Sequence, residues 1–184
     1  MGMVFAYYNG KFEFVGEEGN PVDMGLPEST VFVELPDFPE RLGEKGIREH
    51  YKVEVSKATD SYIKQKLKEI DEDLADLVSE KSWLEGVFAA RGISPEAVRN
   101  ATVAVVVGQK TIDEAISELS IPDDLVSDFK RAVEITKIIA WKEAIWKAET
   151  ELESQIDGMT LEQLLQLDVK NLCEDTYSKI PLEV

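Results

Sequence analysis

An apolar pattern over residues 57–91 constrains this chain more than any other feature. Apolar side chains recur there at alternating intervals of four and three residues, and Lys81 is the one polar residue in the series. This spacing places them along one narrow side of a single helix. The residues between them are mostly Lys, Glu, Asp and Gln, which favour helix and face water. Seven apolar positions form this seam: Ile63, Leu67, Ile70, Leu74, Leu77, Leu84 and Phe88.

A helix of that length needs a long partner. About 35 residues at 1.5 Å per residue make a rod roughly 50 Å long. A second long helix is predicted over residues 122–156, and it could pair with the first within the chain or between chains. Its apolar residues also recur at intervals of three and four. We expect five of them to complete a helix-packing interface with the seven above: Ile138, Trp141, Ile145, Trp146 and Leu152.

The N-terminal residues predict a β-hairpin. Asn9-Gly10 lies between two aromatic-rich segments, and this dipeptide is typical of a two-residue type I′ turn. In the resulting register four aromatic side chains share one face of the hairpin. That face is either the core of a small sheet or a docking face for a partner, and it comprises Phe5, Tyr7, Phe12 and Phe14.

Two further segments predict strands. Residues 30–35 and residues 50–55 alternate between apolar and polar side chains, and the connection between them is rich in Pro and Gly. Residues 1–56 are therefore expected to form a small antiparallel sheet of three or four strands. His50, the only histidine, would lie on the polar face of the last strand.

The remaining segments predict short helices. Ser94-Pro95-Glu96 and the capping box that begins at Thr111 indicate short helices within residues 95–119. Within them, residues 102–107 are rich in valine and fit either a buried helix or a central strand. A capping box at Thr160 begins the short C-terminal helices. The sequence thus predicts an α+β protein, with a sheet over residues 1–56 and a helical region over residues 57–184.

The charge of the chain limits its partners. The formal net charge is −17, with 20 basic and 37 acidic residues, and no basic patch is present. Direct binding to DNA or RNA backbones is therefore disfavoured. The negative charge fits either a solvated surface or a nucleic-acid mimic that occupies a basic groove.

The sequence also bears on location. No apolar run approaches the length of a membrane span, and residues 1–15 do not resemble a secretory signal. Cys173 is the only cysteine, so no disulfide can form within the chain. We expect a cytoplasmic or virion protein that is not secreted by a signal peptide and does not contact a membrane.

No catalytic or ligand motif is found. The sequence has no phosphate-binding glycine loop, no nucleophile elbow and no paired Cys or His ligands. We therefore expect no catalytic residues, no cofactor and no metal. The first hypothesis is a non-catalytic structural or assembly protein, acting by helix packing as a homo-oligomer or in a larger assembly. The alternative is an acidic nucleic-acid mimic that inhibits a nucleic-acid-binding enzyme.

One family resemblance adds to this reading. The tryptophan-bearing run over residues 139–146, followed by the Thr160 capping box, resembles the C-terminal helix of phage tail-fibre-assembly-type proteins. The Tyr-Tyr-Asn-Gly-Lys hairpin over residues 7–11 is similar to the short strands at the start of such proteins. The resemblance implies a virion or virion-assembly component and assigns no functional residue.

Overall fold

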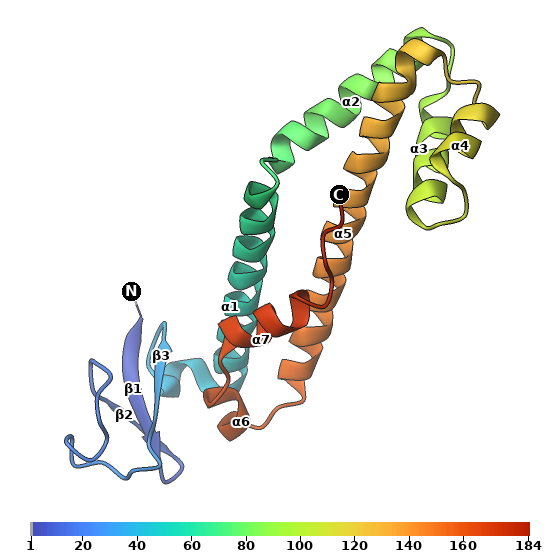
Figure 1. Ribbon diagram of the computed structural model, residues 1–184. Helices are drawn as coiled ribbons and strands as arrows, with labels where there is room; N and C mark the ends of the chain where they lie inside the picture. The colour runs from blue at the N-terminus through green and yellow to red at the C-terminus, as the bar shows by residue number, and fades with distance from the viewer. Residues whose placement is uncertain (1) are drawn as a thin grey trace. The chain divides into compact units, whose positions relative to one another are not determined.

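The computed structural model describes residues 2–184 and begins with a three-stranded antiparallel sheet (Figure 1). Its strands are β1 (Met3–Tyr8), β2 (Lys11–Phe14) and β3 (Val31–Leu35), in the order β2-β1-β3. The predicted hairpin is confirmed. Asn9 and Gly10 both have positive φ, 48° and 76°, as a type I′ turn requires. The predicted pairs, Tyr7 with Phe12 and Phe5 with Phe14, face each other.

A mostly helical region follows the sheet, which confirms the predicted α+β class. The long helices α1 and α5 pack together. The valine-rich run at residues 102–107 is helical through residue 106, so the strand alternative is wrong. The helices are α1 (Pro39–Glu69), α2 (Leu74–Ala90), α3 (Pro95–Val106), α4 (Ile112–Glu118), the 3₁₀ helix η1 (Asp123–Leu125), α5 (Val126–Asp157), α6 (Leu161–Leu165) and α7 (Val169–Tyr177).

The strand predicted at residues 50–55 is wrong, because these residues belong to α1. The alternation of Tyr51, Val53 and Val55 also contains a helical spacing of four. Tyr51 and Val55 are buried, together with Ile47 four residues earlier, whereas Val53 is exposed. Residues at i and i+4 share a helix face, so burial selects the helical reading. The sheet therefore ends at Leu35 and has three strands.

The single rod predicted over residues 57–91 is also wrong, because two helices divide it. α1 ends at Glu69, α2 begins at Leu74, and Asp71 between them has a positive φ of 56°. The Asp73 carboxylate then caps α2 by accepting hydrogen bonds from the backbone N–H groups of Ala75 and Asp76, at 2.8 and 3.3 Å. Aspartate tolerates positive φ and favours helix N-caps, so the acidic residues here favour a break in the helix although the apolar spacing continues across it.

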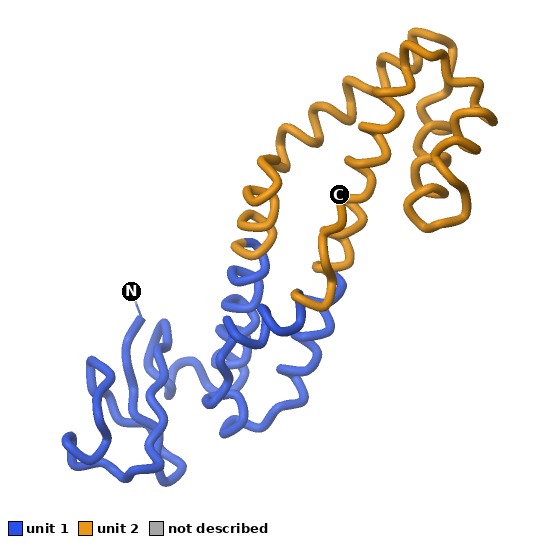
Figure 2. The backbone as a smooth tube through the Cα atoms, viewed as in Figure 1, with its two compact units in different colours: residues 1–60, 147–177 blue, residues 61–146, 178–184 orange. Residues whose placement is uncertain are grey.

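The chain forms two compact units (Figure 2). Unit 1 comprises residues 1–60 and 147–177, and unit 2 comprises residues 61–146 and 178–184. Both long helices contribute to both units. In unit 1, the Lys52 ammonium on α1 pairs with Asp157 on α5 at 2.7 Å. In unit 2, the rings of Tyr62 and Trp141 lie 6.5 Å apart between the same two helices.

Candidate protein-interaction surface

Most of the predicted helix-packing residues lie in the core of the chain. In unit 2, for example, the rings of Phe88 and Phe129 meet edge to face, with centroids 6.5 Å apart. The apolar seam is thus largely covered by the chain's own helices. Nine of the twelve predicted residues are buried: Ile63, Leu67, Leu77, Leu84, Phe88, Ile138, Trp141, Ile145 and Leu152.

The other three predicted residues are not buried. Ile70 is exposed because it lies in the turn between α1 and α2, and Leu74 at the start of α2 is half-buried. The indole of Trp146 is exposed, and the Lys142 ammonium lies 4.3 Å from the ring centroid. The predicted helix-packing interface is therefore not buried at every position.

The aromatic face of the hairpin is mainly core. Phe5 and Tyr7 are buried, Phe12 is half-buried, and the Tyr7 hydroxyl donates a hydrogen bond of 3.0 Å to Glu162. Phe14 is exposed, although its ring packs against Phe5 with centroids 5.6 Å apart. Only Phe14 of these four leaves much of its ring accessible to a partner.

A different surface, on α2, is almost free of charge. The exposed residues of α1 are mostly Lys, Arg, Asp and Glu, as expected for a solvated helix. Among the exposed residues of α2, only Asp76 is charged. The others form what we call the α2 face: Ala75, Val78, Ser79, Ser82, Trp83, Gly86, Ala89 and Ala90.

The α2 face is continuous and includes one bulky side chain. At 100° per residue, its members fall within an arc of about 140° on one side of the helix. Trp83, midway along α2 and at one edge of this arc, is 62% exposed. A methyl group at the neighbouring Gly86 would meet no atom within 4 Å. A large aromatic side chain therefore lies beside an open, small position.

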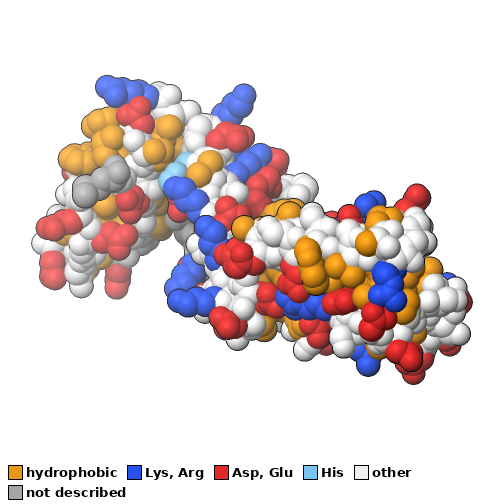
Figure 3. All heavy atoms as spheres, turned by 90° about the horizontal axis from the view of Figure 1, so that it is seen from above, with side chains coloured by type: hydrophobic (Ala, Val, Ile, Leu, Met, Phe, Trp, Pro, Cys, Tyr) orange, Lys and Arg blue, Asp and Glu red, His pale blue; other side chains and the backbone are white. Residues whose placement is uncertain are grey.

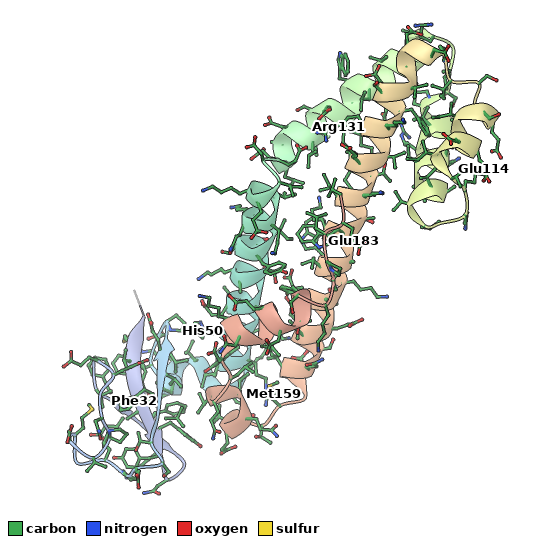
Figure 4. The ribbon with its side chains drawn as sticks, in the orientation of Figure 1. Phe32, His50, Glu114, Arg131, Met159 and Glu183 are labelled. Carbon is green, nitrogen blue, oxygen red and sulfur yellow. The ribbon has the colours of Figure 1, made fainter. Side chains whose placement is uncertain are left out.

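Ion pairs within unit 2 take up charged residues of α2. Arg131 on α5 donates to both carboxylate oxygens of Glu80, each at 2.7 Å (Figure 4). Arg99 on α3 likewise forms a bidentate pair with Glu85, with hydrogen bonds of 2.7 and 3.1 Å. These hydrogen bonds lower the pKa of both carboxyl groups, so both stay ionised. With these charges directed at neighbouring helices, the outer side of α2 is left to small and apolar residues.

One face of the protein surface is drawn in Figure 3. Figure 3 shows acidic and basic side chains scattered over the visible face, with hydrophobic side chains gathered between them. Within residues 2–184, no three His, Cys, Asp or Glu side chains are grouped to hold a metal ion. Nor is any helix in this range long and apolar enough to span a membrane.

Neither Trp83 nor the rest of the α2 face was among the interface residues predicted from the sequence. A signal for them was present, because uncharged small residues recur every three or four positions from Ala75 to Ala90. The more regular apolar seam on the opposite side of the helix obscured this signal.

No family model, curated protein or solved structure matches this chain.

Proposed function

We propose that this protein is a non-catalytic structural or assembly protein whose copies associate through the α2 face. The exposed, uncharged α2 face around Trp83 is the observation that carries this proposal. Contiguous apolar surface with an exposed aromatic residue is typical of a protein–protein contact, and tryptophan is enriched among the residues that dominate binding energy.

Charge favours a second copy as the occupant of the α2 face. Each copy carries a formal net charge of −17, so two copies repel each other over most of their surfaces. The α2 face offers a contact in which only Asp76 brings a charge. Self-association through this face avoids the cost of burying unpaired carboxylates.

The shape of the α2 face is also self-complementary. An antiparallel pairing of two α2 helices that sets Trp83 over Gly86 of a second copy also sets Ser79 over Ala90. The largest side chain of the face then lies against its smallest residue, and the contact is the same on both copies, as two-fold symmetry requires. Small residues allow the two helices to approach closely.

The resemblance to phage tail-fibre-assembly-type proteins suggests where such an assembly would act. It rests on the tryptophan-bearing run of α5 and the Thr160 capping box. On that basis we propose a virion or virion-assembly component.

Light scattering and sedimentation, at low and high protein concentration, test the proposal. We expect a defined oligomer that becomes a monomer in Trp83→Glu. Val107→Glu is the matched control, because Val107 on the same unit is 60% exposed but lies outside the α2 face. A parent protein that stays monomeric at every concentration, or a Trp83→Glu variant that associates like the parent, would refute the proposal.

The dependence of binding on salt concentration distinguishes self-association from nucleic-acid mimicry. Added salt screens the repulsion between copies, so self-association should strengthen as ionic strength rises. A mimic in a basic groove would instead bind its target more weakly in salt. A monomer that inhibits a nucleic-acid-binding enzyme at low salt and loses this effect at high salt would favour mimicry.

A further inference from the structure

Unit 1 contains a large open cleft beside the sheet. Its volume is about 1170 Å³, and its walls are β3, the first part of α1, and the linker between α6 and α7. Figure 4 labels one residue on each of the two main walls, Phe32 on β3 and His50 on α1. Small-molecule pockets are usually about 300–1,000 Å³, so this cleft has room for a larger ligand.

The cleft lies along an unpaired strand edge. β3 pairs with β1 on one side only, and within residues 2–184 no backbone hydrogen bond joins β3 to any element other than β1. In an antiparallel ladder, alternate residues of an edge strand direct their N–H and C=O groups outward. Such an edge is a template for another strand.

The walls of the cleft carry a negative charge. Four carboxylates and one lysine line it, so the acidic residues outnumber the basic one. Lys57 pairs with Glu54 at 3.2 Å, and Lys52, outside the cleft, approaches Glu49 at 3.6 Å. Within residues 2–184, Glu34 and Asp168 are thus the lining carboxylates without a lysine partner. The carboxylates come from all three walls: Glu34 on β3, Glu49 and Glu54 on α1, and Asp168 in the linker. A basic segment would therefore be attracted and an acidic one repelled.

Apolar side chains lie among these carboxylates. Val31 and Phe32 line the cleft from β3, Val53 from α1 and Leu167 from the linker. An extended peptide directs successive side chains to opposite sides. Each wall carries both carboxylates and apolar side chains, so a peptide that alternates basic and apolar residues can contact both kinds of side chain while its backbone pairs with β3.

We propose that this cleft binds an extended, basic segment of a partner protein, which adds a fourth strand to the sheet at β3. β3 of a second copy is a poor occupant, because it has no basic residue and would add its own Glu34 carboxylate to the acidic walls. The site is separate from the α2 face, and the two can be tested independently.

The probe is the peptide acetyl-Lys-Val-Lys-Val-Lys-Val-amide, measured by calorimetry and by amide chemical-shift changes on the full chain. We expect binding that weakens with salt, with the largest shifts at residues 31–35. The acidic counterpart with Glu in place of Lys should not bind. Absence of binding, equal binding of the acidic peptide, or shifts confined to other segments would overturn the proposal.

Two N-methylated forms of the basic peptide test the strand pairing itself. Methyl groups on the odd-numbered amides and on the even-numbered amides change the charge equally, but only one set faces β3 in a paired strand. One form should lose about tenfold or more in affinity and the other should bind nearly as the parent does. Equal affinities of the two forms would show that the cleft attracts charge without pairing a strand.

Charge-reversal substitutions test whether the carboxylates on the cleft walls attract the peptide. Glu49→Lys with Glu54→Lys should weaken peptide binding by about tenfold or more. The matched control is Glu17→Lys with Glu18→Lys, which makes the same change in net charge at two exposed residues of a unit 1 loop. The control should bind as the parent does, and equal losses in both variants would contradict a site at this cleft.

Discussion

Arg131 on α5 forms a bidentate ion pair with Glu80 on α2. Its Nε and Nη2 atoms each donate to a different carboxylate oxygen at 2.7 Å, and Nη2 also lies 2.8 Å from Glu72 in the turn between α1 and α2. One guanidinium on α5 therefore binds both α2 and the turn that begins it. Together with the Asp73 cap, these ion pairs are polar contacts of unit 2 at the break between α1 and α2.

Replacing Arg131 with Met should destabilise the protein by about 1.5–3 kcal/mol, because it removes hydrogen bonds to charged groups. It leaves three carboxylates, those of Glu72, Glu80 and Glu134, without this cation. Arg131 keeps 26% of its side chain exposed, so solvent limits the loss. Urea unfolding measures the loss in the free energy of unfolding. Arg41→Met, which breaks a pair in which Arg41 is 71% exposed, should cost less than about 1 kcal/mol. Equal losses for the two variants would contradict the special role of Arg131.

Replacing Gly86 with Ala should have opposite effects on folding and association. Glycine inside a helix costs about 0.5–1 kcal/mol relative to alanine, and Gly86 has no positive φ that requires it. The variant monomer should therefore be more stable in urea. If a second helix lies over Gly86, the added methyl group should weaken self-association in sedimentation experiments. A variant that associates as strongly as the parent would place the contact elsewhere.

Replacing Gly10 with Val should disrupt the hairpin. Gly10 has a φ of 76°, and a β-branched residue in that conformation costs about 1–3 kcal/mol. We expect the near-ultraviolet signal of the hairpin aromatics to change while the far-ultraviolet helical signal is largely kept. Gly10→Asn is the control, because asparagine tolerates positive φ in this turn. Loss of most helical signal in Gly10→Val would mean that the sheet and the helices unfold together.

Replacing Leu77 with Ala should cost about 2–5 kcal/mol, because Leu77 is completely buried and its removal leaves a cavity. Its neighbour Val78 is exposed on the other side of α2, so Val78→Ala should change the free energy of unfolding by less than about 0.5 kcal/mol. The comparison of the two urea midpoints checks the orientation of α2. Similar midpoints would mean that α2 does not bury the predicted seam.

Replacing Glu149 with Gln should stabilise the protein near neutral pH. Burial raises the pKa of the Glu149 carboxyl in unit 1, and the nearby carboxylates of Glu153 and Asp60 raise it further. Hydrogen bonds with Ser56 and Thr59 lower the pKa, but the net shift is upward. A raised folded-state pKa contributes stability below the unfolded pKa, about 4.3, and this contribution is lost as pH rises through the folded value. The ionised Glu149 is therefore unfavourable at neutral pH.

The urea midpoint of Glu149→Gln should thus exceed that of the parent at about pH 7 and approach it at about pH 4. Glu151→Gln, exposed on the same helix, is the control and should follow the parent at both pH values. A Glu149→Gln variant that is less stable than the parent at neutral pH would contradict the burial argument.

Elements with a strong local signal could be predicted from the sequence. The Asn9-Gly10 turn and the capping boxes at Thr111 and Thr160 were all predicted, and all three form. Each depends on the backbone conformation and hydrogen bonds of a few consecutive residues, which the residue types themselves favour. The apolar spacing of the two long segments likewise identified nine buried residues, five of them in the seam, because periodic apolar spacing is sufficient to indicate a buried side of a helix.

Tertiary structure decided what local pattern left ambiguous. Tyr51 and Val55 fit a strand and a helix equally well in sequence, and packing beside Ile47 selected the helix. The apolar spacing around Ile70 suggested one continuous rod, but the Asp71 conformation, the Asp73 cap and the Arg131 ion pairs favoured a break. Which side of α2 stays uncovered also depends on where α3 and α5 pack. The sequence by itself thus determined the local turns, caps and buried stripes, whereas contacts between distant residues decided which helices break and which faces remain free.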